Sequence, residues 1–158
     1  DAAGRRRQQQ LSPMGELTHL LARIPHLGPM CFIDDVLAVS PSSVETTMTL
    51  RADHILCVGG VVSPIAAIEL FAQSAAVLMS HRTSGTDPNP VAGALLGTRG
   101  VDFLVPSMRV GDVLRVVATE SWGAGALAQF DCELFRGPDS ELCARGTINV
   151  VGEALPPR

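Results

Sequence analysis

Aromatic and charged residues are scarce in this sequence, and tyrosine is missing altogether. Aromatic residues make up 4% and charged residues 18% of the 158 positions, and the formal net charge is −4. A surface that binds nucleic acid needs clustered basic residues, often with aromatic side chains that stack on bases. We therefore expect no nucleic-acid partner.

Closely spaced cysteines are also missing. Cys31, Cys57, Cys132 and Cys143 stand singly along the chain, without a CxxC motif and without histidines at the spacing of zinc ligands. This usage predicts free, buried thiols in a reducing compartment. A role as nucleophile or metal ligand is the less favoured alternative, and the sequence implies no metal or redox cofactor.

No segment has the length or position of a membrane-targeting element. The start of the chain lacks the apolar stretch of a secretory signal peptide. The most apolar run, residues 62–79, is shorter than the roughly 20 residues that span a bilayer. We expect a cytoplasmic protein with no membrane contact. Because hydrophobic residues make up 46% of the chain, more than a monomer needs, we also expect an oligomer.

The two ends of the chain differ in composition from the middle. Residues 1–13 begin with the polar stretch DAAGRRRQQQ and predict a disordered leader, so that Met14 could be a natural start. Residues 153–158, with two consecutive prolines, predict a loose C-terminus. Residues 14–152 fit a single domain, long enough to bury about two-thirds of its unfolded surface.

The apolar run at residues 62–79, VSPIAAIELFAQSAAVLM, predicts a helix. Ser63 can cap its free N–H groups, and Pro64 suits the first turn, where its missing donor costs little. Apolar residues occupy every side of a helical wheel drawn from this segment. The sequence therefore predicts a core helix that is buried all round.

Glu69 and Gln73 are polar residues within this apolar helix. They stand four residues apart, which places them on one face, one turn above the other. An unpaired carboxylate in an apolar interior costs several kcal/mol or takes up a proton, and such a group suits general acid–base catalysis. A structural glutamate, hydrogen-bonded to a loop or a partner subunit, is the alternative that spacing leaves open.

Outside this helix the pattern mostly predicts strands separated by turns that contain glycine, proline or serine. A short helix over residues 14–23 comes first and ends at Ile24-Pro25, which leaves His26 in a loop. Residues 51–60 predict a linker that contains His54 and the pair Gly59-Gly60, which can approach a ligand closely. A surface loop is expected at residues 81–90, and strands at 30–39, 44–50, 91–103, 113–121, 127–136 and 141–151.

This order of elements allows an antiparallel sheet to curl around the long helix and bury it. It resembles the hot-dog fold, an α+β fold in which an antiparallel sheet wraps around one long central helix. The chain also resembles the 3-hydroxyacyl-acyl carrier protein dehydratases of that fold, in particular the branch associated with aryl polyene clusters. The resemblance covers about residues 20–151 and is carried by IPHLGPMCFIDDV, AAIELFAQ, LLGTRGVDFLVPSMRVGDVLRV and ELCARGTINV.

The resemblance implies a site in which the helix glutamate, Glu69, works with a histidine across a dimer interface. The Gly-His-Phe-Pro motif that supplies this histidine in the family is absent, and the family's interval leads back to Ile55, one place from His54. The expected acid is therefore Glu69 and the expected base His54, with His26 of the opening loop as the second candidate. Gln73 would orient the glutamate, and the apolar flank of the helix would line an acyl channel.

The start of the helix departs from the family pattern. There the family has a glycine whose N–H polarises the thioester carbonyl, and this sequence has Pro64, which has no N–H. Loss of one such donor typically costs ~3 kcal/mol of transition-state stabilisation. We expect the N–H of Ile65 to substitute for it, with Gly59 and Gly60 as further substrate-binding residues.

The leading hypothesis is a dehydratase-like protein acting on 3-hydroxyacyl thioesters of acyl carrier protein or coenzyme A, in fatty acid or polyene-type biosynthesis. Such a reaction needs a base for the proton beside the thioester carbonyl and an acid for the departing hydroxyl. The alternatives are a hot-dog acyl thioesterase and a non-catalytic acyl-binding or heterodimer subunit. We expect a homodimer or higher oligomer, or else a heterodimer with another hot-dog subunit.

Overall fold

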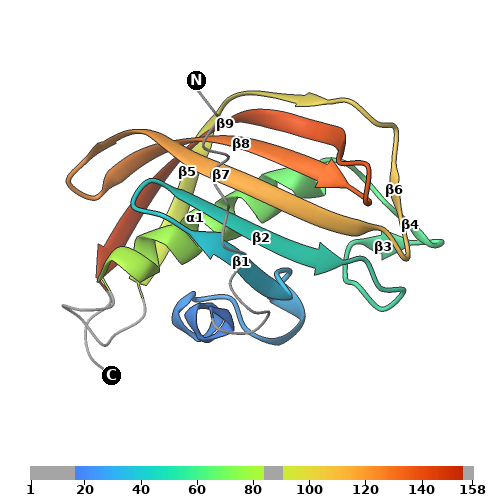
Figure 1. Cartoon of the computed structure of the whole chain (residues 1–158), viewed down its shortest axis with the longest axis horizontal. Helices are drawn as coiled ribbons and strands as arrows, with labels where there is room; N and C mark the ends of the chain where they lie inside the picture. Colours follow the sequence, from blue (N-terminus) through green and yellow to red (C-terminus); the bar gives the residue numbers. More distant parts are fainter. Residues whose placement is uncertain (1–16, 84–90, 155–158) are drawn as a thin grey trace, which may run out of the picture.

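A computed structural model of the chain describes residues 17–83 and 91–154 (Figure 1). The expected leader at residues 1–13 and Met14 lie outside the described residues. So do residues 84–90 of the expected surface loop and residues 155–158 of the expected loose C-terminus.

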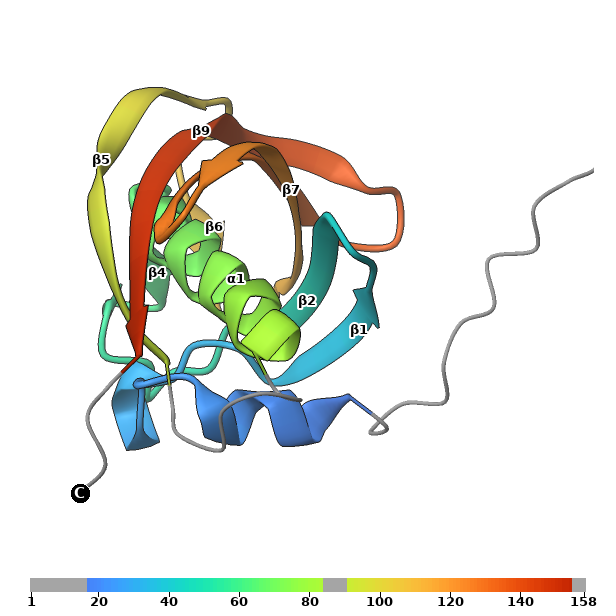
Figure 2. The same ribbon diagram turned by 90° about the vertical axis from the view of Figure 1, so that its left-hand side faces the viewer.

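Six strands form one sheet in the order β1-β2-β7-β8-β9-β5, with every neighbouring pair antiparallel. Figure 2 shows this sheet curled around the helix α1, Ala66–Thr83. The predicted α+β class and the predicted sheet around one long helix are therefore confirmed. The strands are β1 Asp35–Val39, β2 Ser43–Thr49, β5 Val91–Phe103, β7 Val113–Ala124, β8 Leu127–Arg136 and β9 Glu141–Ala154.

A second, three-stranded sheet was not predicted from the sequence. It consists of β3 Cys57–Val58, β4 Val61–Val62 and β6 Met108–Arg109, in the order β3-β4-β6. Gly59 and Gly60 join β3 to β4 with φ angles of 60° and 79°. A two-residue hairpin turn of this kind needs positive φ at both positions, which glycine adopts without strain. The segment expected to be a linker is therefore partly a hairpin.

The helix α1 begins and ends later along the chain than residues 62–79, although its start signal is as predicted. The Ile65 N–H donates to Ser63 Oγ at 3.4 Å, and the Ala66 and Ala67 N–H groups donate to the Ser63 and Pro64 carbonyls. The first turn is thus wound tightly from Ser63 onward. Ser63, as a capping residue, and Pro64, which suits the first turn, fix where the helix can start.

The prediction that the helix is buried all round is wrong for one side of α1. Residues such as Ala67, Phe71 and Leu78 are fully buried against the sheet. A stripe at helical spacing on the other side of α1 is only half-buried. This stripe consists of Ile68, Glu69, Ala72, Ala76 and Met79.

The opening segment crosses the end of the curled sheet as two short 3-10 helices, η1 Thr18–Arg23 and η2 Gly28–Met30. Leu20 and Ile24 of this segment are buried in the core. The strand predicted from residue 30 begins only at Asp35, because η2 and an extended stretch occupy the positions before it. None of the described helices is long and apolar enough to cross a membrane.

Strand β5 is one edge of the large sheet, since it pairs with β9 and with no other described strand. Its pairing is irregular between Leu95 and Gly97 and again between Thr98 and Gly100. Opposite this stretch on β9, a Cβ atom at Gly146 would lie 2.5 Å from the Gly100 carbonyl oxygen. The two strands can approach this closely only because Gly146 has no side chain.

Candidate active site

Glu69 lies in the first turn of α1, on the half-buried stripe. Its side chain is 36% exposed, so the carboxylate is neither deeply buried nor free in solvent. Its Oε1 atom accepts a hydrogen bond from Gln73 Nε2 at 2.9 Å. The contact expected from the four-residue spacing is therefore made.

Gln73 is fully buried and joins α1 to the opening segment. Its Oε1 accepts the Phe32 N–H at 2.9 Å, and its Nε2 donates to the Met30 carbonyl at 2.8 Å as well as to Glu69. Both N–H donors of the amide and its carbonyl oxygen are thus hydrogen-bonded, which fixes the orientation of the side chain. Gln73 fixes the Glu69 carboxylate relative to the backbone that follows His26.

His26 lies between η1 and η2, after Ile24-Pro25 has ended the first 3-10 helix as the sequence predicts. Its Nε2 atom is 3.3 Å from Glu69 Oε1, and its side chain is 24% exposed. The Nδ1 atom of His26 is buried and makes no hydrogen bond to any described residue. The imidazole and the carboxylate thus form a pair within one chain.

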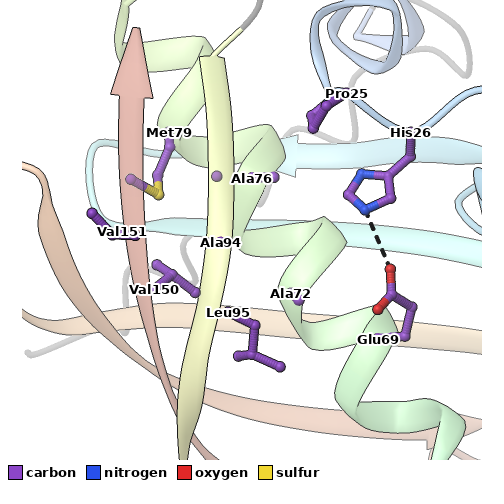
Figure 3. A pocket seen from close by; sticks show the side chains of 11 residues that line it. Pro25, His26, Glu69, Ala72, Ala76, Met79, Ala94, Leu95, Val150 and Val151 are labelled. Atoms are coloured by element: carbon purple, nitrogen blue, oxygen red, sulfur yellow. Dashed lines mark ion pairs between the residues drawn. The ribbon is translucent and has the colours of Figure 1, made fainter. Parts of the chain in front are cut away.

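The pair lies at one end of a pocket between α1, the opening segment and the β5–β9 edge of the sheet. Figure 3 shows His26 and Glu69 on one side of this pocket, with Met79, Val150 and Val151 on the other. The cavity volume is about 100 Å³. Apart from the pair, the wall consists of Pro25, Ala72, Ala76, Met79, Gly93, Ala94, Leu95, Val150 and Val151.

His54, the histidine expected to be the base, does not line this pocket. Its ring packs on Phe32 with 4.5 Å between ring centroids, and its Nδ1 accepts the Leu56 N–H at 3.2 Å. Burial, followed by the nearby positive charge of Arg51, lowers the pKa of His54. The neutral imidazole therefore carries its proton on Nε2, which is buried and unbonded among the described residues.

The residues expected to bind substrate near the helix start also lie outside the pocket wall. Gly59 and Gly60 form the exposed β3–β4 turn, and the Ile65 side chain is exposed while its N–H donates to Ser63 Oγ. Within residues 17–83 and 91–154, no group of three or more His, Cys, Asp or Glu side chains could hold a metal ion. The assignments of His54, His26, Glu69, Gln73 and these residues to catalysis or binding stay predictions.

Neither the pocket wall on β5 and β9 nor the backbone groups that hold Gln73 could be predicted from the sequence. Gly93 and Leu95 come from one strand and Val150 from another, and a strand pattern does not say which face lies over α1. On α1 itself, Ala72 and Ala76 stand four residues apart on the face of Glu69. This four-residue spacing of small residues was the one signal in the sequence that could have indicated the pocket wall.

The fold defines the class of protein, the hot-dog fold, in which an antiparallel sheet curls around one long helix. A solved structure, the dehydratase heterocomplex ApeI:P from Xenorhabdus doucetiae, matches with a TM-score of 0.76 and 26% identity over 84% of this chain and 90% of that chain. A hypothetical thioesterase with coenzyme A from Streptococcus pneumoniae matches with a TM-score of 0.57 and 14% identity, over 78% of this chain and 88% of that chain.

A third similar structure is the E. coli PaaI protein from the phenylacetic acid degradation operon. Its TM-score is 0.56 with 17% identity, over 74% of this chain and 81% of that chain. The structures under 25% identity support the fold alone. No curated protein sequence matches the chain.

The sequence profile of the ApeP-like family, described as ApeP dehydratase, matches residues 18–155. The chain belongs to this family. The resemblance to the aryl polyene dehydratase branch is confirmed, and so is the leading hypothesis of a dehydratase-like hot-dog protein, a lyase by reaction class.

Proposed function

We propose that the chain dehydrates 3-hydroxyacyl thioesters, with His26 and Glu69 as the acid–base pair. The observation that carries this proposal is the 3.3 Å contact between His26 Nε2 and Glu69 Oε1 at the end of an apolar pocket. The pair offers two proton-transferring groups, and the pocket offers an apolar surface for an acyl chain. The carrier is acyl carrier protein or coenzyme A.

In the proposed reaction, the pair supplies one proton, which Glu69 delivers to the leaving group. His26 removes a proton from C2 of the substrate, and the electrons of that C–H bond form the C2–C3 double bond. The C3–O bond breaks, and Glu69 gives its proton to the departing hydroxyl, which leaves as water. The proton on His26 then returns to Glu69 across the 3.3 Å contact, so the pair is reset.

Gln73 is a positioning residue in this proposal. Its amide donates to Glu69 Oε1 while the Met30 carbonyl and the Phe32 N–H hold it in place. The second oxygen of Glu69 is not used by this amide and remains for the substrate hydroxyl. A carboxylate held in this way needs no reorientation during the reaction.

Two histidine variants with the same substitution test which imidazole is the base. His26→Asn should lower kcat/KM for dehydration by about 10²–10⁴, the usual contribution of a positioned acid or base. His54→Asn retains an acceptor for the Leu56 N–H and should keep kcat/KM within a few-fold of wild type. The measurement is mass spectrometry of the products from 3-hydroxyacyl thioesters on both carriers.

A loss of activity in His54→Asn alone would reassign the base to His54. Circular dichroism of both variants checks that neither has lost its fold. Release of the free acid, rather than loss of water, by the wild-type protein would replace the dehydratase proposal by thioester hydrolysis.

We further propose that a second hot-dog subunit, in the first instance a second copy of this chain, pairs along the edge of β5. Two features support this. The edge of β5 is unpaired among the described strands, and Leu95, which lines the pocket, and Leu96 are both exposed there. The ApeI:P structure is itself a heterocomplex, so a different hot-dog subunit is the alternative occupant.

Leu96→Asp should weaken this association at least tenfold, because it places a charge on the apolar edge. Leu96 is 58% exposed in the isolated chain, and Val113, which is 51% exposed at the start of β7, supplies the matched control Val113→Asp. Sedimentation velocity at micromolar concentration measures the effect. If the wild-type chain alone is a monomer there, pairing with a second copy is wrong.

We also propose a reducing, cytoplasmic location. All four cysteines are free thiols, and Cys132 and Cys143 are buried in the sheet. Burial raises the pKa of both thiols, so neither is poised for oxidation.

A further inference from the structure

The pocket runs along one face of α1 between walls of very small residues. Ala72 and Ala76 lie on successive turns of the helix, and Gly93 and Ala94 lie opposite them on β5. None of these four residues has a side chain longer than a methyl group. The space between helix and strand therefore exists because the sequence leaves it empty at these positions.

Met79 stands at the far end of the same helix face, next to Val150 and Val151 of β9 (Figure 3). Met79 comes ten positions after Glu69, which at ~1.5 Å per residue is about 15 Å along the helix. After the run of alanines, Met79 is the first long side chain that α1 contributes to the wall. It is therefore placed to close the pocket.

We propose that Met79 limits the length of the acyl chain that the pocket accepts, and that Ala72 and Ala76 keep the path to it open for an unbranched chain. This inference rests on the proposed function, because it takes an acyl thioester as the occupant. Its reactive carbons lie at His26 and Glu69, and its tail points toward Met79.

The position of Met79 sets the expected preference, because a chain that starts at His26 and Glu69 meets this side chain after about 15 Å along α1. A longer chain can enter only if the Met79 side chain moves aside, which its unbranched, flexible structure makes possible at a cost.

The test compares three variants on 3-hydroxyacyl-CoA thioesters from butanoyl to dodecanoyl. Met79→Ala should raise the ratio of kcat/KM for dodecanoyl over hexanoyl about tenfold or more, the discrimination that one or two methylene groups give in an apolar pocket. Ala76→Leu should lower the same ratio by a similar factor, because it blocks the path before Met79. Ile68→Ala is the matched control, since Ile68 is half-buried on α1 but does not line the pocket.

A second readout separates this inference from the proposed reaction. Isothermal calorimetry measures binding of saturated acyl-CoA thioesters of the same lengths, which cannot be dehydrated. If the wild-type protein dehydrates no substrate but Met79→Ala still shifts the binding optimum to longer chains, the reaction is wrong and the pocket assignment stands. An unchanged length profile in Met79→Ala by both readouts, or an equal shift in Ile68→Ala, overturns the inference.

Discussion

Replacing Glu69 by glutamine is expected to abolish dehydration and leave the fold intact. An amide cannot give a proton to the departing hydroxyl, and loss of a positioned acid lowers rates by about 10²–10⁴. The new side chain has the same size, and its carbonyl oxygen can still accept the Gln73 N–H that now reaches Glu69 at 2.9 Å. Mass-spectrometric product analysis and the thermal unfolding midpoint measure the two parts of this expectation.

Glu133→Gln makes the same chemical change on the exposed face of β8 and serves as the control. It should retain wild-type turnover. Turnover of Glu69→Gln equal to that of Glu133→Gln would remove Glu69 from the mechanism and leave the helix glutamate with a structural role.

The largest effect on stability is expected from Gln73→Met. Methionine has a similar volume but cannot bond the Phe32 N–H or the Met30 carbonyl, which Gln73 now holds at 2.9 and 2.8 Å. Each group left unsatisfied costs about 1–3 kcal/mol, so we expect a loss of about 2–4 kcal/mol and a midpoint lower by roughly 5–10 °C. Dehydration should also fall at least tenfold, because Glu69 and the segment carrying His26 lose their common anchor.

Gln129→Met, at a half-buried position on β8, provides the comparison for this variant. In chemical denaturation, Gln129→Met should lower the free energy of unfolding by only a fraction of the loss expected for Gln73→Met. A Gln73→Met protein within 0.5 kcal/mol of wild type, which is the usual range of a surface substitution, would show that the amide does not anchor the opening segment.

The sequence predicted the helix and most of the large sheet because both depend on local signals. Ser63-Pro64 marks the start of α1, and strand β5 has the bounds expected from its composition and flanking turns. The small sheet was missed because β3, β4 and β6 are two-residue strands, too short for any periodicity. The half-buried stripe on α1 was missed because apolar composition does not reveal where a sheet leaves the helix uncovered.

The proposed pair could be predicted only in part for a similar reason. The four-residue spacing of Glu69 and Gln73 is local, and the structure shows the contact. The approach of His26 to Glu69 joins positions 43 residues apart, as does the contact of Gln73 with Met30. Counting back along the family pattern favoured His54, and only the folded chain shows that the opening loop passes closer to the carboxylate.

His26 is carried by a segment that belongs to neither sheet. The η1–η2 segment is held by the burial of Leu20 and Ile24 and by the bonds of Gln73, whereas the large sheet is held by its own strand pairing. Detachment of this segment would separate the imidazole from Glu69 while the strands stay paired. With His26 as the proposed base, a local opening equilibrium would then set the active fraction of molecules, and activity would be lost in protein that remains folded.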